Sequence, residues 1–323
     1  MNNCIEGVMT LKNVMILSGG TSTAWHIAQV LRSFFNDYIY LIVCDINEQN
    51  LVHTATLADE FLTVPAIKSS GYYDFMLSCI REKKVDILIP LIDDDILLFS
   101  CDNPDLISLG VCSTAPTSLV TEALSNKKKL WNTLNKIKVA TPFVYNNAAE
   151  LNPTLQYFVK NEVGCGSRGV ELINGAIAGR LLQDGKVVQE VCSKPEITVD
   201  VVHKENRVYT ICRERKETKL GVSTKCRVYY DAEIQAIMER IVSCIALPSV
   251  CCVQFMKNSN GEWALIDFNL RSGGGTAISA AVGFQAVRFA AAGWLGLPGD
   301  AAWVPEIKSE HYVVRAYQEI VTL

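Results

Sequence analysis

The sequence predicts an α/β protein whose first part is built around a parallel sheet and whose second part is rich in strands. Over residues 13–115, short apolar runs alternate with amphipathic stretches of helical length, which is typical of βαβ units. From residue 157 onward, strand-like runs follow one another around a single long amphipathic helix at residues 233–247. With 323 residues, 49% of them apolar, the chain is long enough for two or three packed units.

Composition and charge argue against several classes of function. Thirty Lys plus Arg and 34 Asp plus Glu give a net charge of -4 with no long basic run, so we expect neither nucleic acid nor a membrane surface as a partner. No stretch approaches the roughly 18–20 consecutive apolar residues that a bilayer requires, and the apolar run at residues 14–17 is too short for an export signal. We expect a soluble, cytoplasmic protein.

The twelve cysteines contain no CxxC pair. We interpret them as reduced thiols that act as small core residues, in agreement with a cytoplasmic location. The adjacent Cys251 and Cys252 allow a redox or metal site, but their strand-like surroundings favour the core interpretation.

The first predicted strand, residues 13–17, ends in a glycine turn, Ser18 to Thr21, that opens a predicted helix at 23–35. Free amides at such a turn can hold an anion. Asp45, after the second predicted strand at 38–44, stands where a Rossmann protein places the acid that binds ribose. A nicotinamide-dependent oxidoreductase is therefore one alternative. The turn lacks the third glycine of G-x-G-x-x-G, and a tight turn explains the same glycines.

The rest of the pattern predicts three units, residues 1–115, 116–188 and 189–323. The first boundary lies near residues 113–125, where a stretch rich in Ser, Thr and Pro precedes an amphipathic helix at 126–139. The other predicted elements are a helix at 74–84, strands at 85–92, 157–160, 170–173, 186–191, 196–203, 207–213, 251–257 and 262–268, and a final apolar helix after the glycines at 273–275.

Two features of the middle unit fit a polyphosphate ligand. Lys160 ends a predicted strand and precedes a glycine-rich loop at 164–170. Glycine lets backbone amides approach phosphate oxygens, and lysine neutralises their charge. Lys127 to Lys129 begin a predicted helix, where three positive charges oppose the helix macrodipole. Taken separately, a surface turn and a solvated run of charges are the structural alternatives.

A hairpin in the last unit is expected to gather oxygen ligands. If residues 258–261 form its loop, Gln254 pairs with Leu265 and is a diagonal neighbour of Asp267. Asn269 shares a strand face with Asp267. Two amide oxygens and a carboxylate suit Mg²⁺ when phosphate oxygens complete the site. A strand with a solvated polar face is the alternative.

Two further segments fit the same ligand. Arg271 follows Asp267 and Asn269 along the chain. Its guanidinium can bind a transferred phosphoryl group through two hydrogen bonds. The stretch Gln189 to Glu196 has the composition of an extended linker whose backbone can match the edge of adenine, with a carboxylate nearby for the ribose hydroxyls. Alone, this stretch is indistinguishable from an acidic loop.

Together, the order and spacing of these features resemble the ATP-grasp superfamily, in particular the branch similar to the carbamoyl phosphate synthase large subunit. The stretches ADEFLTVP and VDILIPLIDDD in the N-terminal part look like that branch as well. The resemblance implies an ATP-grasp fold with a Rossmann-like preceding domain, a small lid and a C-terminal ATP-binding domain. It also implies ATP and Mg²⁺, or Mn²⁺, as cofactors.

The resemblance also implies a role for each motif. Some positions depart from the usual pattern: Asn161 replaces a proline, Lys194 replaces a glycine, and Asp267-Phe268-Asn269-Leu270-Arg271 replaces Glu-x-Asn-Pro-Arg. The implied residues are Lys127 and Lys160 on the α- and β-phosphates, the loop with Gly166, Ser167 and Gly169 over the triphosphate, Gln189, Glu190, Val191 and Cys192 at the adenine, Glu196 at the ribose, Gln254, Asp267 and Asn269 on the metal, and Arg271 near the γ-phosphate.

The resemblance implies a ligase that uses ATP to convert a carboxylate into an acylphosphate, which an amine then attacks. Its substrates would be small carboxylates and amines, and a homodimer is a reasonable expectation. Arg213, Arg215 and Lys219, in a stretch interpreted as a loop, are candidates for holding an anionic substrate, Arg213 first among them. The amides of Ser272 to Thr276 are candidates for the acyl group. A degenerate, regulatory ATP-binding module is the second alternative, because Asp267 and Leu270 depart from the family pattern.

Overall fold

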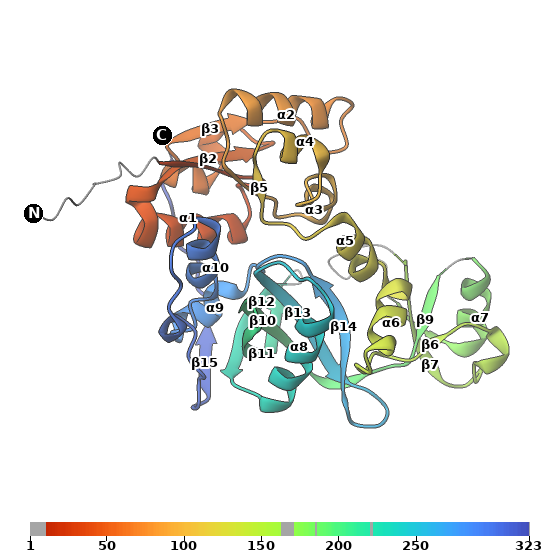
Figure 1. Ribbon diagram of the computed structural model, residues 1–323. Coiled ribbons are helices and arrows are strands. Elements are labelled where there is room, and N and C mark those ends of the chain that lie inside the picture. Colours follow the sequence, from red (N-terminus) through yellow and green to blue (C-terminus); the bar gives the residue numbers. More distant parts are fainter. Residues whose placement is uncertain (1–10, 163–170, 185, 220–221, 323) are drawn as a thin grey trace, which may run out of the picture.

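The structure, a computed structural model, describes residues 11–162, 171–184, 186–219 and 222–322. Three sheets organise the chain (Figure 1). In the described part of the chain no helix is both long and apolar enough to cross a membrane, and the cysteines there are free thiols. Short 3-10 helices join the elements at Asn36–Tyr38, Gln49–Leu51, His53–Leu57, Ala148–Glu150 and Ala301–Trp303.

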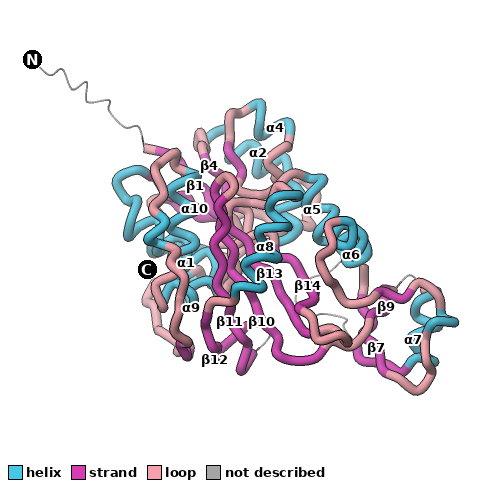
Figure 2. The backbone as a smooth tube through the Cα atoms, turned by 60° about the horizontal axis from the view of Figure 1, so that its bottom comes forward, coloured by secondary structure: helices cyan, strands magenta, loops and turns pink. Residues whose placement is uncertain are grey.

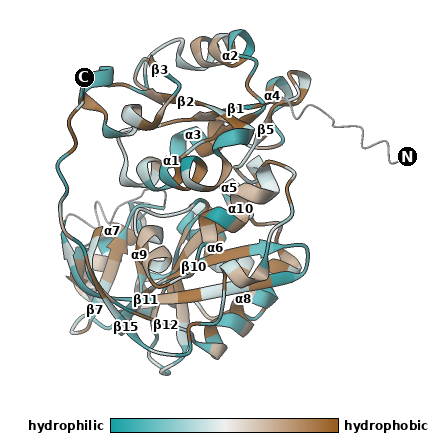
Figure 3. Ribbon diagram, turned by 90° about the vertical axis from the view of Figure 1, so that its left-hand side faces the viewer, coloured by the Kyte–Doolittle hydropathy of each residue, from teal (hydrophilic) through white to brown (hydrophobic). Residues whose placement is uncertain are grey.

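The N-terminal sheet has five parallel strands in the order β3-β2-β1-β4-β5, which confirms the predicted βαβ arrangement. Helix α1 packs on one face and helix α2 on the other, so the central strands are apolar on both sides, as Figure 3 shows for β1 and β2. The elements are β1 Lys12–Ile16, α1 Ser22–Phe35, β2 Ile39–Asp45, β3 Glu60–Thr63, α2 Tyr72–Glu82, β4 Ile87–Ile89, α3 Asp93–Leu98, α4 Pro104–Ser108 and β5 Cys112–Ser113.

Two helices lead from this sheet to a small antiparallel sheet in the order β6-β9-β7-β8. Helix α7 packs on it around Tyr157 and Val159. Figures 1 and 2 both show the small sheet extending beyond α6, away from the N-terminal sheet. The elements are α5 Ser118–Ser125, α6 Lys127–Lys136, β6 Val144–Tyr145, β7 Gln156–Lys160, β8 Glu171–Asn174, α7 Gly175–Gln183 and β9 Val187–Gln189.

The largest sheet has six strands in the order β14-β13-β10-β11-β12-β15, paired antiparallel throughout. Helices α6 and α8 pack on one face, and α9 and α10 cover the other. The elements are β10 Ser193–Lys204, β11 Arg207–Lys219, β12 Val222–Tyr229, α8 Ala232–Cys244, β13 Val250–Lys257, β14 Trp263–Asn269, α9 Thr276–Ala281, α10 Ala286–Trp294 and β15 His311–Val314.

Helix α10 belongs to two hydrophobic cores at once. Val287 and Ala291, one turn apart, pack with α1 and the N-terminal sheet. Phe289 and Ala290 pack with β10 and β13 of the six-stranded sheet. Because the helix is rich in alanine, α1 of the N-terminal unit and β10 of the six-stranded sheet can both pack closely against it.

Several sequence-based expectations were wrong in detail. Arg215 and Lys219 lie in strand β11 and not in a loop, because β12 extends the hairpin as its antiparallel partner. Arg213 lies in the same strand, within the strand predicted at residues 207–213. The final apolar helix is two helices, α9 and α10, broken at residues 282–285. The limits of the three units at residues 115 and 188 stay a prediction.

The hairpin that carries the metal ligands has a different register from the one expected. Phe255, and not Gln254, pairs with Leu265, and a bulge lies between Gln254 and Phe255. The loop spans residues 258–262, one residue longer than expected, and the bulge adds a further residue to β14. Gln254 therefore lies directly opposite Asp267, closer than the diagonal placement expected from the sequence.

Candidate functional site

A cleft of about 280 Å³ lies where α3, α5, α6 and β14 meet. It combines acidic residues of α3 with lysines of α6 and polar residues of β14. Three of the residues predicted from the sequence therefore share one cleft, although they come from two separate regions of the chain. The lining residues are Asp93, Asp94, Leu97, Thr121, Glu122, Ser125, Asn126, Lys127, Lys129, Asp267, Phe268 and Asn269.

The start of α6 is held against the end of β7. Asn126 caps the helix by accepting hydrogen bonds from the amides of Lys128 and Lys129, both at 3.0 Å. The Lys127 amide donates to the Glu162 carbonyl oxygen at 2.8 Å. This bond joins the helix that carries Lys127 to the segment that follows Lys160.

Lys127, Lys160 and Asp267 form one charged group. The Lys127 ammonium is paired with Asp267 Oδ1, and its side chain is only 10% exposed. Burial and then the nearby positive charge of Lys127 lower the pKa of Lys160 to about 8, against the opposing effects of Asp267 and Cys192. Two cations facing a single carboxylate leave positive charge for an anionic ligand.

We expect nucleotide affinity to fall with rising pH because of Lys160. With a pKa of about 8 the ammonium is charged below that pH and neutral above it, and polyphosphate favours the charged form. If binding requires that charge, the affinity for ADP should drop about tenfold between pH 7 and pH 9. Isothermal titration calorimetry across that range measures it. A Lys160→Met variant should show a flat profile, and an equal drop in this variant would contradict the assignment.

The predicted metal ligands lie on neighbouring strands. Gln254 of β13 faces Asp267 of β14, and Asn269 follows two residues later on the same strand face. All three side chains are partly exposed, whereas Phe268 between them points into the core. In the described residues no group of three or more His, Cys, Asp or Glu is placed to hold a metal. One carboxylate and two amides fit Mg²⁺ when phosphate oxygens complete the shell.

The predicted adenine hinge is anchored by Glu190. Its amide donates to the Phe143 carbonyl at 3.0 Å, and its carboxylate accepts from the amides of Phe143 at 2.8 Å and Ser259 at 3.2 Å. Glu190 thus fixes the link between β9 and β10 through its side chain, leaving the exposed Val191 beside it. Gln189 and Cys192 are buried.

Glu196, predicted at the ribose, is paired with Arg215 of the neighbouring strand. A hydroxyl ligand would share the Glu196 carboxylate with that guanidinium. Gly166, Ser167 and Gly169 of the predicted lid loop lie outside the described residues, and their role stays a prediction.

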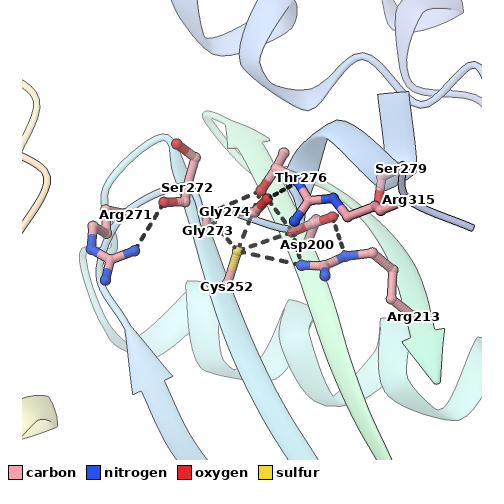
Figure 4. A network of polar contacts seen from close by, with 10 residues as sticks. All are labelled: Asp200, Arg213, Cys252, Arg271, Ser272, Gly273, Gly274, Thr276, Ser279 and Arg315. Atoms are coloured by element: carbon pink, nitrogen blue, oxygen red, sulfur yellow. Dashed lines mark hydrogen bonds and ion pairs between the residues drawn. The ribbon is translucent and has the colours of Figure 1, made fainter. Parts of the chain in front are cut away.

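Arg271 leaves β14 at the edge of a glycine turn, residues 273–275 (Figure 4). Its Nη1 donates to the Ser272 carbonyl at 3.2 Å. Its Nε is buried and has no hydrogen-bond partner in the described part of the chain. A buried donor without a partner is costly, so this atom fits a site that is completed by an anionic ligand.

Beside this turn lies a buried polar network that the sequence did not reveal. Asp200 of β10 accepts from Arg213 Nε at 2.8 Å and Nη2 at 2.7 Å, and also from Cys252, Thr276 and Ser279 (Figure 4). Burial alone would raise the pKa of Asp200, but the charge and hydrogen bonds of Arg213 hold it below its usual range. One signal in the sequence could have revealed the network: Asp200 lies inside the apolar run ITVDVV, and a buried acid requires a polar or charged partner.

The network constrains the glycine turn. A Cβ on Gly275 would overlap the Arg213 guanidinium, one on Gly273 would lie 3.0 Å from Cys252 Sγ, and one on Gly274 would lie 2.7 Å from Ser22 Oγ. The Gly273 amide donates to Cys252 Sγ and Thr276 Oγ1, both at 3.1 Å. Of the amides predicted to cradle an acyl group, this one is therefore already engaged within the protein.

In the glycine turn after β1, the backbone amides of Gly19 and Gly20 already donate hydrogen bonds within the protein. The Gly19 amide donates to the Cys44 carbonyl at 2.8 Å, and the Gly20 amide donates to Asp45 Oδ2 at 2.7 Å. Asp45 Oδ1 accepts from the amide of Asn47 at 3.0 Å. The acid that would bind a ribose thus holds the turn together, which favours the tight-turn interpretation over a dinucleotide site.

Two parts of the chain match models of known families. Residues 14–113 match the model of the PylC-like N-terminal domain, and residues 184–319 match a family described as ATP-grasp in the biosynthetic pathway with Ter operon. The second match assigns the last part of the chain, residues 184–319, to an ATP-grasp family. The predicted superfamily and fold class are thereby confirmed.

Solved structures share the ATP-grasp fold of this chain at low sequence identity. The biotin carboxylase of Campylobacter jejuni has a TM-score of 0.74 and 12% identity, over 94% of this chain and 75% of that one. The ADP complex of Staphylococcus aureus N5-carboxyaminoimidazole synthetase has a TM-score of 0.71 and 15% identity, over 94% and 82%. The L-amino acid ligase of Bacillus licheniformis has a TM-score of 0.70 and 12% identity, over 91% and 77%. A search of curated proteins gives no match.

Proposed function

We propose that this ATP-grasp protein is an ATP-dependent ligase that activates a small carboxylate as an acylphosphate and joins it to an amine. The observation that carries the proposal is the meeting of Lys127, Lys160 and Asp267, which lie far apart in the sequence, in one charged group beside a cleft. The L-amino acid ligase among the similar structures supports the same class of reaction.

A carboxylate has no good leaving group, so an amine cannot displace one of its oxygens until that oxygen is phosphorylated. A carboxylate oxygen attacks the γ-phosphorus of ATP, the bond to the bridging oxygen of ADP breaks, and the acylphosphate forms. The amine nitrogen then attacks the acyl carbon, phosphate leaves, and the nitrogen loses a proton. Positioning and charge neutralisation supply most of the rate.

The chain's own residues would divide this work. Lys127 and Lys160 bind the α- and β-phosphates, and Arg271 holds the γ-phosphoryl group through the guanidinium that contains the unpaired Nε. Gln254, Asp267 and Asn269 would hold Mg²⁺, which supplies charge neutralisation at the phosphates. The hinge at Glu190 to Cys192 positions the adenine, and Glu196 positions the ribose.

Nucleotide binding tests the proposal and separates it from the alternatives. ADP with Mg²⁺ at about 100 times its Kd should stabilise the protein by about 2.7 kcal/mol, measured as a shift in melting temperature, and NADH should cause no shift. A Lys127→Met variant should bind ADP more than about tenfold more weakly, since it loses a charge-assisted contact. Lys128→Met is the matched control, because Lys128 is the next residue of α6 and is exposed.

The outcomes are distinct. A shift with NADH and none with ADP would refute the ligase proposal in favour of the oxidoreductase. A shift with ADP, but no phosphate release from ATP with any of a panel of amino acids, small carboxylates and amines, would favour the regulatory module. Equal loss of ADP affinity in both lysine variants would show a non-specific charge effect and contradict the assigned role of Lys127.

A further inference from the structure

Arg315 lies directly after β15 and reaches the glycine turn at residues 273–275. Its Nη2 donates to the Gly274 carbonyl oxygen, as Figure 4 shows. Its side chain is half-buried, and burial and then the charge of Arg213 lower its pKa. The ion pairs in the described part of the chain leave Arg315 without an acidic partner.

The other charges around Arg315 do not compensate it. Asp200 is the nearby acid, and both of its carboxylate oxygens already accept hydrogen bonds from Arg213. The two arginines and one aspartate leave a net charge of plus one. Burial lowers the pKa of His26 on α1 to about 4, although Asp200 opposes this shift. The imidazole is therefore neutral at pH 7 and adds no charge of its own.

Three separate parts of the fold meet at this point. Ser22 of α1 lies beside Gly274, since a Cβ on that glycine would be only 2.7 Å from Ser22 Oγ, and His26 follows one turn later on the same helix face. The glycine turn itself follows Arg271, the residue assigned to the γ-phosphoryl group. Arg315 comes from the opposite end of the chain. Helix α1 and the glycine turn thus both lie beside the uncompensated guanidinium of Arg315.

We propose that Arg315, backed by Arg213, binds an oxyanion of the acid substrate. A guanidinium offers two parallel donors that match a carboxylate or a phosphoryl group, and a half-buried cation without an acidic partner is stabilised by such a ligand. The anion is the carboxylate of the acid or the phosphoryl group of its acylphosphate. This proposal rests on the proposed ligase function and names a substrate contact outside the nucleotide cleft.

The test uses two anionic probes on the full chain in the presence of Mg²⁺ and ADP. Inorganic phosphate and acetate are titrated separately by calorimetry, with acetamide as the neutral counterpart of acetate. The wild-type protein should bind at least one of the anions and should not bind acetamide. Arg315→Gln should weaken that binding at least about tenfold, as expected for losing a charge-assisted pair of hydrogen bonds. Binding of phosphate alone identifies the phosphoryl group, and binding of acetate alone identifies the carboxylate.

Two further variants make the result decisive. Arg207→Gln removes an exposed arginine of the same sheet and should leave anion binding unchanged. Arg315→Lys keeps the positive charge but loses the two parallel N–H donors of the guanidinium, so it should lose part of the affinity for the anion. It replaces Arg315→Gln in the test if the Gln variant does not fold. Wild-type protein that binds neither anion, or Arg315 variants that bind both as well as wild type, would overturn the proposal.

The outcome is separable from that of the proposed function. Failure of the anion site leaves ADP binding intact in every variant. Failure of the ligase proposal appears instead as absent ADP binding in the wild-type protein. In that case the two anions are titrated without nucleotide, and loss of their binding in Arg315→Gln would still support the anion site.

Discussion

An Asp267→Asn variant is expected to lose about 10²–10³-fold in ATP turnover, the effect typical of removing one group that stabilises developing charge. The substitution keeps size and shape but removes the carboxylate from the predicted Mg²⁺ ligands. It also releases Lys127 from its ion pair, so binding of ADP without metal should be unchanged or tighter. Phosphate release measures turnover, and calorimetry with and without Mg²⁺ measures binding.

The control for Asp267 is Asp37→Asn, an equivalent change at an exposed position between α1 and β2. It should leave turnover and the Mg²⁺ dependence of ADP binding at wild-type values. An Asp267→Asn protein whose ADP affinity still rises with Mg²⁺ as in wild type would remove this carboxylate from the metal site. The role of Asp267 would then be limited to its ion pair with Lys127.

An Asp200→Asn variant should be destabilised by about 3–5 kcal/mol, because it leaves the buried Arg213 guanidinium without its counter-charge. Both side chains are almost fully buried, at 0% and 3% exposure, so water cannot replace the lost partner. Urea unfolding followed by fluorescence measures the change. An exposed pair gives the contrast: Glu217→Gln removes the partner of Lys225 at the surface, and we expect almost no change in stability.

A double variant separates the pair from the rest of the network. Arg213→Met alone leaves Asp200 charged and buried, whereas Asp200→Asn with Arg213→Met removes both charges. The double variant should therefore be more stable than the sum of the single effects indicates. Additive effects would show that the hydrogen bonds from Cys252, Thr276 and Ser279 hold Asp200 without Arg213.

The sequence was sufficient for features that depend on local pattern. The parallel N-terminal sheet followed from alternating apolar and amphipathic segments, and α6 and α8 followed from their apolar stripes. Lys127 and Asp267 were recognised through motifs whose order along the chain is fixed. Their direct ion pair was not foreseen, because it depends on how α6 docks beside β14.

Other features depend on contacts between distant segments and could not be read locally. The hairpin register was wrong for two reasons: Lys257 pairs with Trp263, so the loop is one residue longer than expected, and a bulge that no local signal reveals then places Gln254 opposite Asp267. Asp200 and Arg213 pair across a hairpin, so neither residue alone shows its partner. Arg315 stands in a polar tail without a motif, and only the pairing of β15 with β12 brings it to the glycine turn.

Helix α10 contributes to two hydrophobic cores, and this restricts which of the three sheets can move relative to the others. Since one short helix contributes residues to the cores of both the N-terminal and the six-stranded sheets, separating those sheets would expose apolar surface on both sides of it. The two sheets should therefore move and unfold as one cooperative block. Entry of a nucleotide would then depend on swinging of the four-stranded sheet, whose core is made of its own residues and helix α7.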